Sequence, residues 1–204
     1  MNTQTRLTAG RPRDRKSSCR GQSLIEFALV LPFLLLVVLG VIEVGHLLFE
    51  QQVVTRLSRE GSNLISRDVS LQDAATALKS MSSRPVDFDS GSRLIFSVVK
   101  RGGTPGTANY DRLILYQRYE YGTLATPSTL QTSGGGSFGG APDYIAVNSD
   151  TDTRLQLTNV STDLVTVKGG MVYITEIYAT HSTITPAFRF GVTVPGTLHS
   201  IAYF

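Results

Sequence analysis

The sequence predicts an α+β fold, in which a long N-terminal transmembrane helix continues into an amphipathic helix packed on a mostly antiparallel β-sheet domain. Three observations predict it. Residues 27–42 carry no charged side chain, apolar residues recur at helical spacing as far as residue 65, and strand-like segments follow from residue 93. A helix laid across one face of an antiparallel sheet accommodates all three.

The uncharged segment is long enough to cross a membrane. It reads FALVLPFLLLVVLGVI, and the apolar character extends outward to Leu24 and Leu48. A span needs roughly 20 mostly apolar residues, because each helical residue covers about 1.5 Å of a hydrocarbon layer about 30 Å thick. A secretory signal has a shorter apolar region and ends at a small-x-small cleavage site, which this segment does not offer. We therefore expect a transmembrane helix at residues 22–48, with a buried core helix as the alternative.

Charge is concentrated ahead of this segment. Residues 1–20 hold six basic side chains and one acid, Asp14, a net charge of +5; the basic residues are Arg6, Arg11, Arg13, Arg15, Lys16 and Arg20. The whole chain is +3, so the remainder is −2 and offers no basic surface for a nucleic acid. By the positive-inside tendency, the N-terminus is expected in the cytoplasm and residues after about 50 outside it.

Two residues in the apolar stretch are unusual for a plain membrane anchor. Glu26 is ionisable, and a carboxylate at the centre of a span costs about 2.5–3.5 kcal/mol, so such a residue usually marks a function. The alternative is that Glu26 merely lies at the level of the lipid headgroups. Pro32 removes the helical hydrogen bond to the carbonyl of Ala28, which predicts a kink.

Residues 49–82 are expected to form an amphipathic helical segment. Apolar or small residues recur at helical spacing on one side, namely Val54, Leu57, Gly61, Leu64 and Ile65. Ser70 and Asp73 form a candidate capping box at the start of a second, short helix over residues 71–81.

Residues 83–204 are expected to form an exported β-rich domain. Strand patterns occur at residues 94–99, 112–121, 154–157, 164–167, 172–178, 188–194 and 201–204. A glycine-rich turn at 102–106 predicts a hairpin of the first two strands. The glycine-rich loop 133–140 lacks the spacing and the following lysine of a phosphate-binding loop, so we expect no nucleotide site there.

No pattern in the sequence indicates catalysis, and we expect no enzyme activity, no cofactor and no metal. The three histidines, His46, His181 and His199, are far apart in the sequence and lack the spacing of metal ligands. The cluster of aromatic residues around Tyr119 could stack on a sugar or a nucleic acid. Alternating aromatics in a strand are more often core residues and cross-strand pairs, which is the interpretation we favour.

The residues around Glu26 also resemble a known family. The string RGQSLIEFALVLP at residues 20–32 resembles the start of TadE-like proteins, the minor pilins or pseudopilins of tight-adherence (Tad) type IV pilus systems. Gly40, Glu43, Gly45 and the Arg-Glu-Gly sequence at 59–61 are also similar to this family. The resemblance covers about a quarter of the chain, residues 18–67.

The resemblance implies a processing site and an assembly residue. In type IV prepilins a membrane-embedded aspartyl peptidase cuts after the glycine that ends a basic leader, and the fifth residue of the mature chain is Glu. Carried over to this sequence, residues 1–21 are the leader, the cut falls between Gly21 and Gln22, and Glu26 is the fifth mature residue.

The function implied is that of a minor pilin or pseudopilin, which takes part in the assembly or priming of a Tad-type adhesive pilus. The partners implied are the inner membrane, a prepilin peptidase, other major and minor pilins, and the pilus assembly machinery. The protein is then expected to span the bacterial inner membrane once, with its C-terminal domain periplasmic or extracellular. A signal-anchored exported domain with a binding or hydrolytic function, whose helix is only a tether, remains the alternative.

Overall fold

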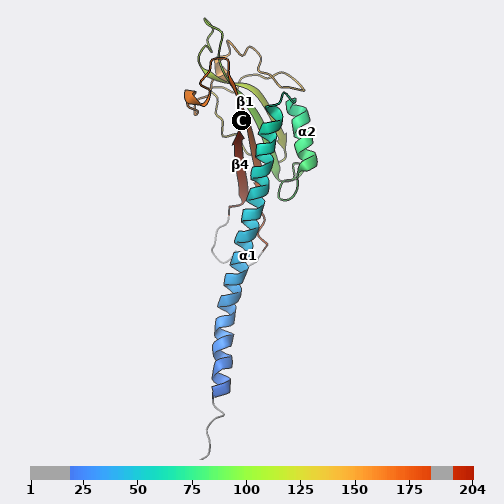
Figure 1. Ribbon diagram of the computed structural model, residues 1–204, viewed down its shortest axis with the longest axis vertical. Helices are drawn as coiled ribbons and strands as arrows, with labels where there is room; N and C mark the ends of the chain where they lie inside the picture. Colours follow the sequence, from blue (N-terminus) through green and yellow to red (C-terminus); the bar gives the residue numbers. More distant parts are fainter. Residues whose placement is uncertain (1–18, 185–194) are drawn as a thin grey trace, which may run out of the picture. The chain divides into compact units, whose positions relative to one another are not determined.

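The computed structural model describes residues 19–184 and 195–204, with side chains from residue 21 onward. The chain divides into two compact units, Met1–Ile42 and Glu43–Phe204. Its main elements are the helices α1 (Cys19–Ile65) and α2 (Leu71–Met81) and the strands β1 (Ser92–Arg101), β2 (Leu113–Gly122), β3 (Met171–Thr180) and β4 (Thr197–Tyr203) (Figure 1). The predicted α+β class is confirmed.

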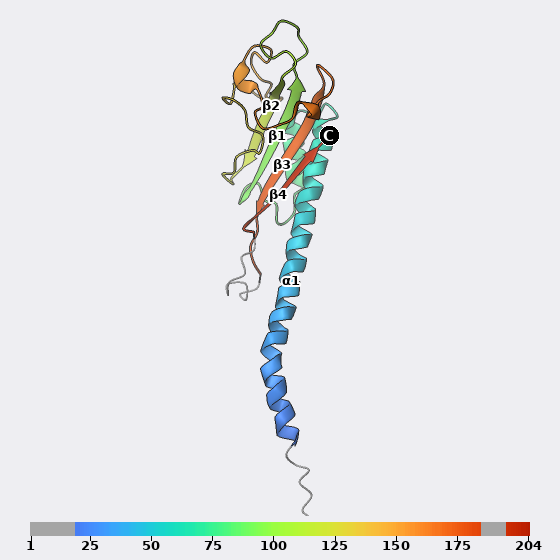
Figure 2. The same ribbon diagram turned by 90° about the vertical axis from the view of Figure 1, so that its left-hand side faces the viewer.

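The four strands form one antiparallel sheet in the order β2-β1-β3-β4 (Figure 2). β1 and β2 are the predicted hairpin, whose register shifts between Val98 and Val99. β4 is the edge strand beside α1, where the hydroxyls of Ser58 and Ser200 lie 2.9 Å apart and Ser62 donates to the carbonyl of Ala202. The C-terminal part of α1 is thereby attached to the edge of the sheet.

One face of the sheet packs against the C-terminal part of α1 and against α2. The core there is built from alternate strand residues and from the apolar stripes of both helices: Val54, Leu57, Leu71, Ala74, Leu78, Leu94, Phe96, Val98, Ile177 and Ala179. Tyr116, Tyr119 and Tyr121 pack against the same core, which confirms the interpretation of these tyrosines as packing residues. Along β1 and β3 the residues that point into this layer are two positions apart, as a pleated strand requires. Along β2, Tyr116 and Tyr119 are three positions apart, because the register of β1 and β2 shifts between Val98 and Val99.

The start of α2 is fixed by Ser70, as the sequence predicts. The backbone N–H of Asp73 donates to Ser70 Oγ at 3.2 Å, and Ser70 Oγ donates to the carboxylate of Asp73 at 2.7 Å. These bonds satisfy one of the N–H groups that the first turn leaves without a helical partner. Helix α2 therefore begins where its apolar stripe can reach the sheet.

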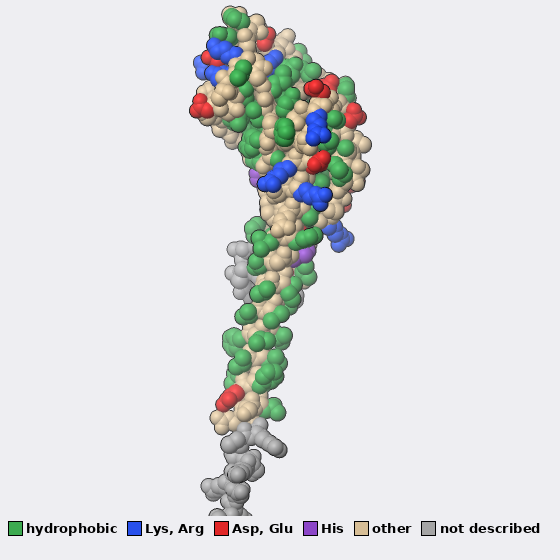
Figure 3. Space-filling view, in the orientation of Figure 1, with side chains coloured by type: hydrophobic (Ala, Val, Ile, Leu, Met, Phe, Trp, Pro, Cys, Tyr) green, Lys and Arg blue, Asp and Glu red, His purple; other side chains and the backbone are tan. Residues whose placement is uncertain are grey.

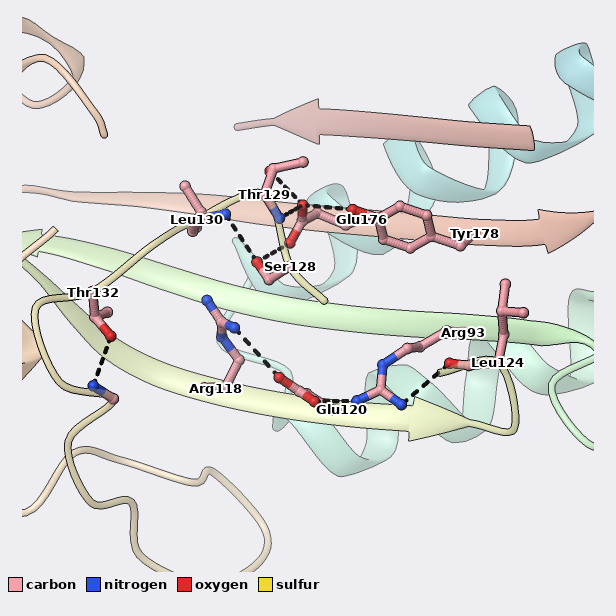
Figure 4. Close-up of polar contacts among 11 residues, drawn as sticks. Arg93, Arg118, Glu120, Leu124, Ser128, Thr129, Leu130, Thr132, Glu176 and Tyr178 are labelled. Atoms are coloured by element: carbon pink, nitrogen blue, oxygen red, sulfur yellow. Dashed lines mark hydrogen bonds and ion pairs between the residues drawn. The ribbon is translucent and has the colours of Figure 1, made fainter. Parts of the chain in front are cut away.

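The opposite face of the sheet carries a buried carboxylate, Glu176 on β3, which is closed to solvent. Figure 4 shows the loop over it: the backbone N–H and hydroxyl of Thr129 donate to Glu176 at 2.8 and 2.5 Å, and Ser128 donates to its other oxygen. Tyr178 also donates to this carboxylate, and burial together with the neighbouring negative charge raises the pKa of Tyr178. The long connection between β2 and β3 is held onto the sheet by these bonds.

Two predicted strands are wrong, and a third lies outside the described residues. Residues 154–157 and 164–167 contain no strand, because Thr153–Leu155 and Thr162–Leu164 form short 3-10 helices instead. The side chain of Asp152 starts the first by accepting a hydrogen bond from the backbone N–H of Arg154, and Ser161 starts the second by accepting one from Asp163. Such local bonds compete with sheet pairing. The strand expected at 188–194 falls among residues that the structure does not describe.

Gly61 lies at the closest approach of α1 to the sheet. A Cβ added there would lie 2.7 Å from Thr175 Cγ2 and 2.9 Å from Leu78 Cδ1, too close for carbon atoms. Gly45 in the same helix has no atom within 4 Å of an added Cβ. Of these two glycines, only Gly61 is therefore required by packing.

We expect Gly61→Ala to destabilise the folded domain by about 1–3 kcal/mol, because overpacking must displace Thr175 or Leu78. The measurement is thermal unfolding of the full chain in detergent micelles, followed by circular dichroism. Gly45→Ala is the matched control, and should be neutral or stabilising by up to about 1 kcal/mol, since alanine favours a helix. An unfolding midpoint for Gly61→Ala at or above that of the wild type would refute the close packing.

Candidate functional site

The N-terminal unit consists, in its described part, of a helix without packing partners of its own. Large apolar side chains such as Leu24, Phe27, Phe33 and Val37 are more than three-fifths exposed, and the visible face of this part of α1 in Figure 3 is covered mainly by hydrophobic side chains. Its most apolar 18-residue window has a mean hydropathy of 2.8. A surface of this kind requires lipid or other apolar helices as neighbours. The helix therefore has the length and composition of a membrane anchor.

Gly21 lies in the first turn of α1, which begins at Cys19. By its resemblance to prepilins, Gly21 is expected to end a leader, and a protease needs an extended backbone at its cleavage site. In the structure the backbone there is helical, because the strongly helix-forming run that follows extends through it. The first four N–H groups of a helix have no helical partner, and glycine weakens a helix by about 1 kcal/mol relative to alanine, so this turn is easily opened.

Gln22 and Glu26 are the two residues that the structure brings together at this end. The side-chain amide of Gln22 donates to Glu26 Oε1 at 3.0 Å, one helical turn away. Both side chains are exposed to solvent in the structure of the single chain. A carboxylate in this position lies near the N-terminal end of the helix, where the helix dipole favours a negative charge.

Pro32 lies inside α1, which continues through it without interruption from Cys19 to Ile65. The proline has no N–H to donate to the carbonyl of Ala28, and one helical hydrogen bond is therefore missing. A kink at this position stays a prediction.

A separate group of polar side chains lies at the start of the Glu43–Phe204 unit. His46 and Glu50 are one turn apart on α1, with His46 Nε2 3.6 Å from Glu50 Oε1. His181, directly after β3, places its Nδ1 2.5 Å from the other oxygen of Glu50. The Nε2 atom of His181 lies 3.7 Å from the carboxylate of Glu43, and this carboxylate also accepts a hydrogen bond from the backbone N–H of Ile184.

Sequence reasoning missed this cluster. His46 and His181 are 135 positions apart, yet their ring centroids lie 6.1 Å from each other. The sequence signal that was available is the spacing of His46 and Glu50, because residues four apart share one face of a helix. His181 could not be paired with them without the sheet, since its position follows from where β3 ends against α1. His199 is placed elsewhere, stacked on Tyr178 at 4.3 Å.

Comparison with known protein families identifies the N-terminal part of the chain. The family model described as TadE-like protein matches residues 21–63. This chain carries a TadE-like domain. The match begins at Gly21 and covers most of α1, including Gln22, Glu26 and Pro32. Comparisons with curated proteins and with solved structures gave no match.

The TadE-like domain connects the chain with the Tad pilus system. TadE-like proteins are a structural, non-enzymatic family, in agreement with a sequence that shows no catalytic pattern. The apolar helix near the N-terminus and the pilus family together fit a membrane-anchored component that associates with the pilus machinery.

Proposed function

We propose that this chain is a minor pilin or pseudopilin that takes part in the assembly or priming of a Tad-type adhesive pilus. The observation that carries the proposal is the TadE-like match at residues 21–63, which starts at the glycine that the prepilin pattern places at the end of the leader. The exposed apolar surface of the helix supports it, because such a surface is suited to packing against other pilin helices.

In this proposal the chain is inserted in the bacterial inner membrane with its basic N-terminus in the cytoplasm. A prepilin peptidase removes residues 1–21 and leaves Gln22 as the new N-terminus. Residues 22–48 then form the span, residues 49–82 the helical layer of the exported part, and residues 83–204 its β-rich domain. The net charge of +5 ahead of the apolar run supports this orientation.

Glu26 has the role of an assembly residue in this scheme. Cleavage creates an α-ammonium group at Gln22, which would be costly to bury among packed helices without a counter-charge. The contact between Gln22 and Glu26 within one chain supports this role, because the carboxylate reaches back one helical turn to Gln22, the first residue of the proposed mature chain. The same reach toward the N-terminus of a neighbouring subunit would set the axial register of the packed helices.

Removal of this chain from its native host tests the proposed function. We expect the deletion strain to lose surface pili, counted by electron microscopy, and to regain them when the full-length chain is supplied from a plasmid. The control is a supplied chain that begins at residue 43 behind an unrelated cleavable signal peptide, which exports the Glu43–Phe204 unit without the apolar part of α1 that precedes it. Unchanged piliation in the deletion strain, or full rescue by the chain that begins at residue 43, would contradict the proposal.

A further inference from the structure

The cluster of His46, Glu50 and His181 is unusual for the amount of charge it buries. The Glu43 and His181 side chains are each 1% exposed and that of Glu50 is 8% exposed. Ionised groups removed from water cost several kcal/mol each unless they are compensated. Glu43 and Glu50 are both acids and His181 contacts both of them, so two carboxylates lie around one buried imidazole, with His46 beside Glu50.

The side chains also converge with their ligand atoms facing one another. His46, Glu50 and His181 each offer one nitrogen or oxygen, and these atoms all lie within 4.8 Å of one another. The second nitrogens, His46 Nδ1 and His181 Nε2, are buried and make no hydrogen bond among the described residues. Buried polar atoms are usually hydrogen-bonded, so this cluster is not explained as an ordinary packed pair of histidines.

We propose that His46, Glu50 and His181 bind one divalent transition-metal ion, and that this ion is zinc. Two imidazoles and one carboxylate suit zinc, which takes three protein ligands and a fourth position filled by water in its open sites. The proposal rests on residues of the Glu43–Phe204 unit alone and does not depend on the assignment of the chain as a pilin.

The geometry requires only small side-chain adjustments. Ligands about 2.0–2.1 Å from a tetrahedral zinc ion lie roughly 3.3 Å from each other. His46 Nε2 and Glu50 Oε1 are 3.6 Å apart, and His181 Nδ1 and Glu50 Oε2 are 2.5 Å apart. Rotations that move these atoms by about 1 Å bring all three into range. The cluster borders a cavity of about 650 Å³, also lined by Arg84 and Asp87, from which water can reach the fourth position.

Glu43 is the positioning residue of this site. With zinc on Nδ1 of His181, the Nε2–H points toward the carboxylate of Glu43, now 3.7 Å away. Metal-binding histidines commonly donate their other N–H to a carboxylate, which fixes the orientation of the ring. The backbone N–H of Ile184 holds Glu43 in place at 3.1 Å.

The ion would act as a structural clamp. His46 and Glu50 belong to α1, whereas His181 belongs to the segment that leaves β3. A zinc ion joins these two segments directly where the apolar run gives way to the folded unit, and binding to the folded state alone stabilises that state. The site would thus add a metal-dependent link to the hydrogen bonds and packing that already attach this part of α1 to the sheet.

Zinc binding by the full chain in detergent micelles tests the proposal. All samples carry Cys19→Ser, which removes the one thiol that could bind zinc, and no histidine tag. After treatment with a chelator, the protein is titrated with Zn²⁺ against a chromophoric competitor, and bound zinc is counted by mass spectrometry. We expect one zinc ion per chain and a higher thermal unfolding midpoint with zinc than without it.

Matched variants separate ligands from other histidines. His46→Gln, Glu50→Gln and His181→Gln should each lower the zinc affinity by more than about 100-fold, and Glu43→Gln by about 10- to 100-fold. His199→Gln, a histidine outside the cluster, should bind like the parent. Circular dichroism checks that each variant is folded, and His46→Gln decides the question if the buried variants unfold, because the His46 side chain is 33% exposed. Absence of stoichiometric zinc, or equal zinc affinity in folded His46→Gln and His199→Gln, would overturn the proposal.

Discussion

Replacing Glu26 by alanine is expected to leave processing intact and to abolish assembly. In the proposed scheme peptidase access depends on the leader and on Gly21, so the variant should still be cut to the mature length. Packing differs, because the α-ammonium of Gln22 would be buried without its counter-charge. Breaking a buried ion pair by removing one partner costs about 3–5 kcal/mol, which corresponds to at least a 100-fold loss in the assembly equilibrium.

The measurement is recovery of the variant with sheared pili and with partner pilins after mild solubilisation. We expect processed Glu26→Ala protein to accumulate in the membrane and to be missing from both fractions. Glu60→Ala is a matched control, since Glu60 is an exposed acid on the same helix and far from Gln22. Wild-type recovery of Glu26→Ala would reduce Glu26 to a residue at the headgroup level, and the proposed role in register would be wrong.

Replacing Gly21 by leucine is expected to block processing almost completely. Leucine stabilises the first turn of α1 by close to 1 kcal/mol and adds a side chain at the position before the cut, where the prepilin pattern has glycine. The full-length chain should therefore persist in cells with active prepilin peptidase. Gly45→Leu, in the same helix but away from the cut, should be processed like the wild type.

This variant also separates the proposed pilin from the alternative considered from the sequence. A domain held by a plain membrane tether keeps its leader, and neither substitution would then change the length of the chain. Normal shortening of Gly21→Leu would show that the cut does not depend on Gly21.

The fold was largely predictable because its main signals are local. The apolar run, the capping residues Ser70 and Asp73, and the hairpin of β1 and β2 each follow from a pattern within a short window of sequence. The sheet order was not predictable in the same way. β1 pairs with β3 across some 70 intervening residues, and nothing local in either strand specifies that partner.

The errors have one physical origin in common. Segments 154–157 and 164–167 alternate like strands, yet Asp152 and Ser161 bind nearby backbone N–H groups and start short turns instead. The segment at 153–157 still contributes single bridges to the rest of the domain, through Gln156 to Ile114 and through Leu157 to Thr132. The strand-like pattern agrees with burial at Leu155, which is closed to solvent, but not at Val167, which is 68% exposed, and neither segment forms a regular strand.

The candidate sites differ in the same way, between residues with a local sequence signal and residues brought together by the tertiary structure. Gln22, Glu26 and Pro32 are found from sequence because their spacing along one helix is their signal. The cluster around His181 requires β3 to deliver a residue to the face of α1 that carries His46 and Glu50, which is a property of the tertiary structure. A search for a histidine and a carboxylate four residues apart on a helix would have found His46 and Glu50 but not His181.

Intact mass spectrometry of the protein purified from its native membrane tests the central claim most directly. The proposed function predicts a mature chain that begins at Gln22 and is shorter than the unprocessed protein by the 21 residues of the leader. Modification of the new N-terminus, by methylation or by cyclisation of the glutamine, would add or remove a small defined mass without changing that length. A protein that still carries residues 1–21, in cells whose prepilin peptidase is active on another pilin, would contradict the account.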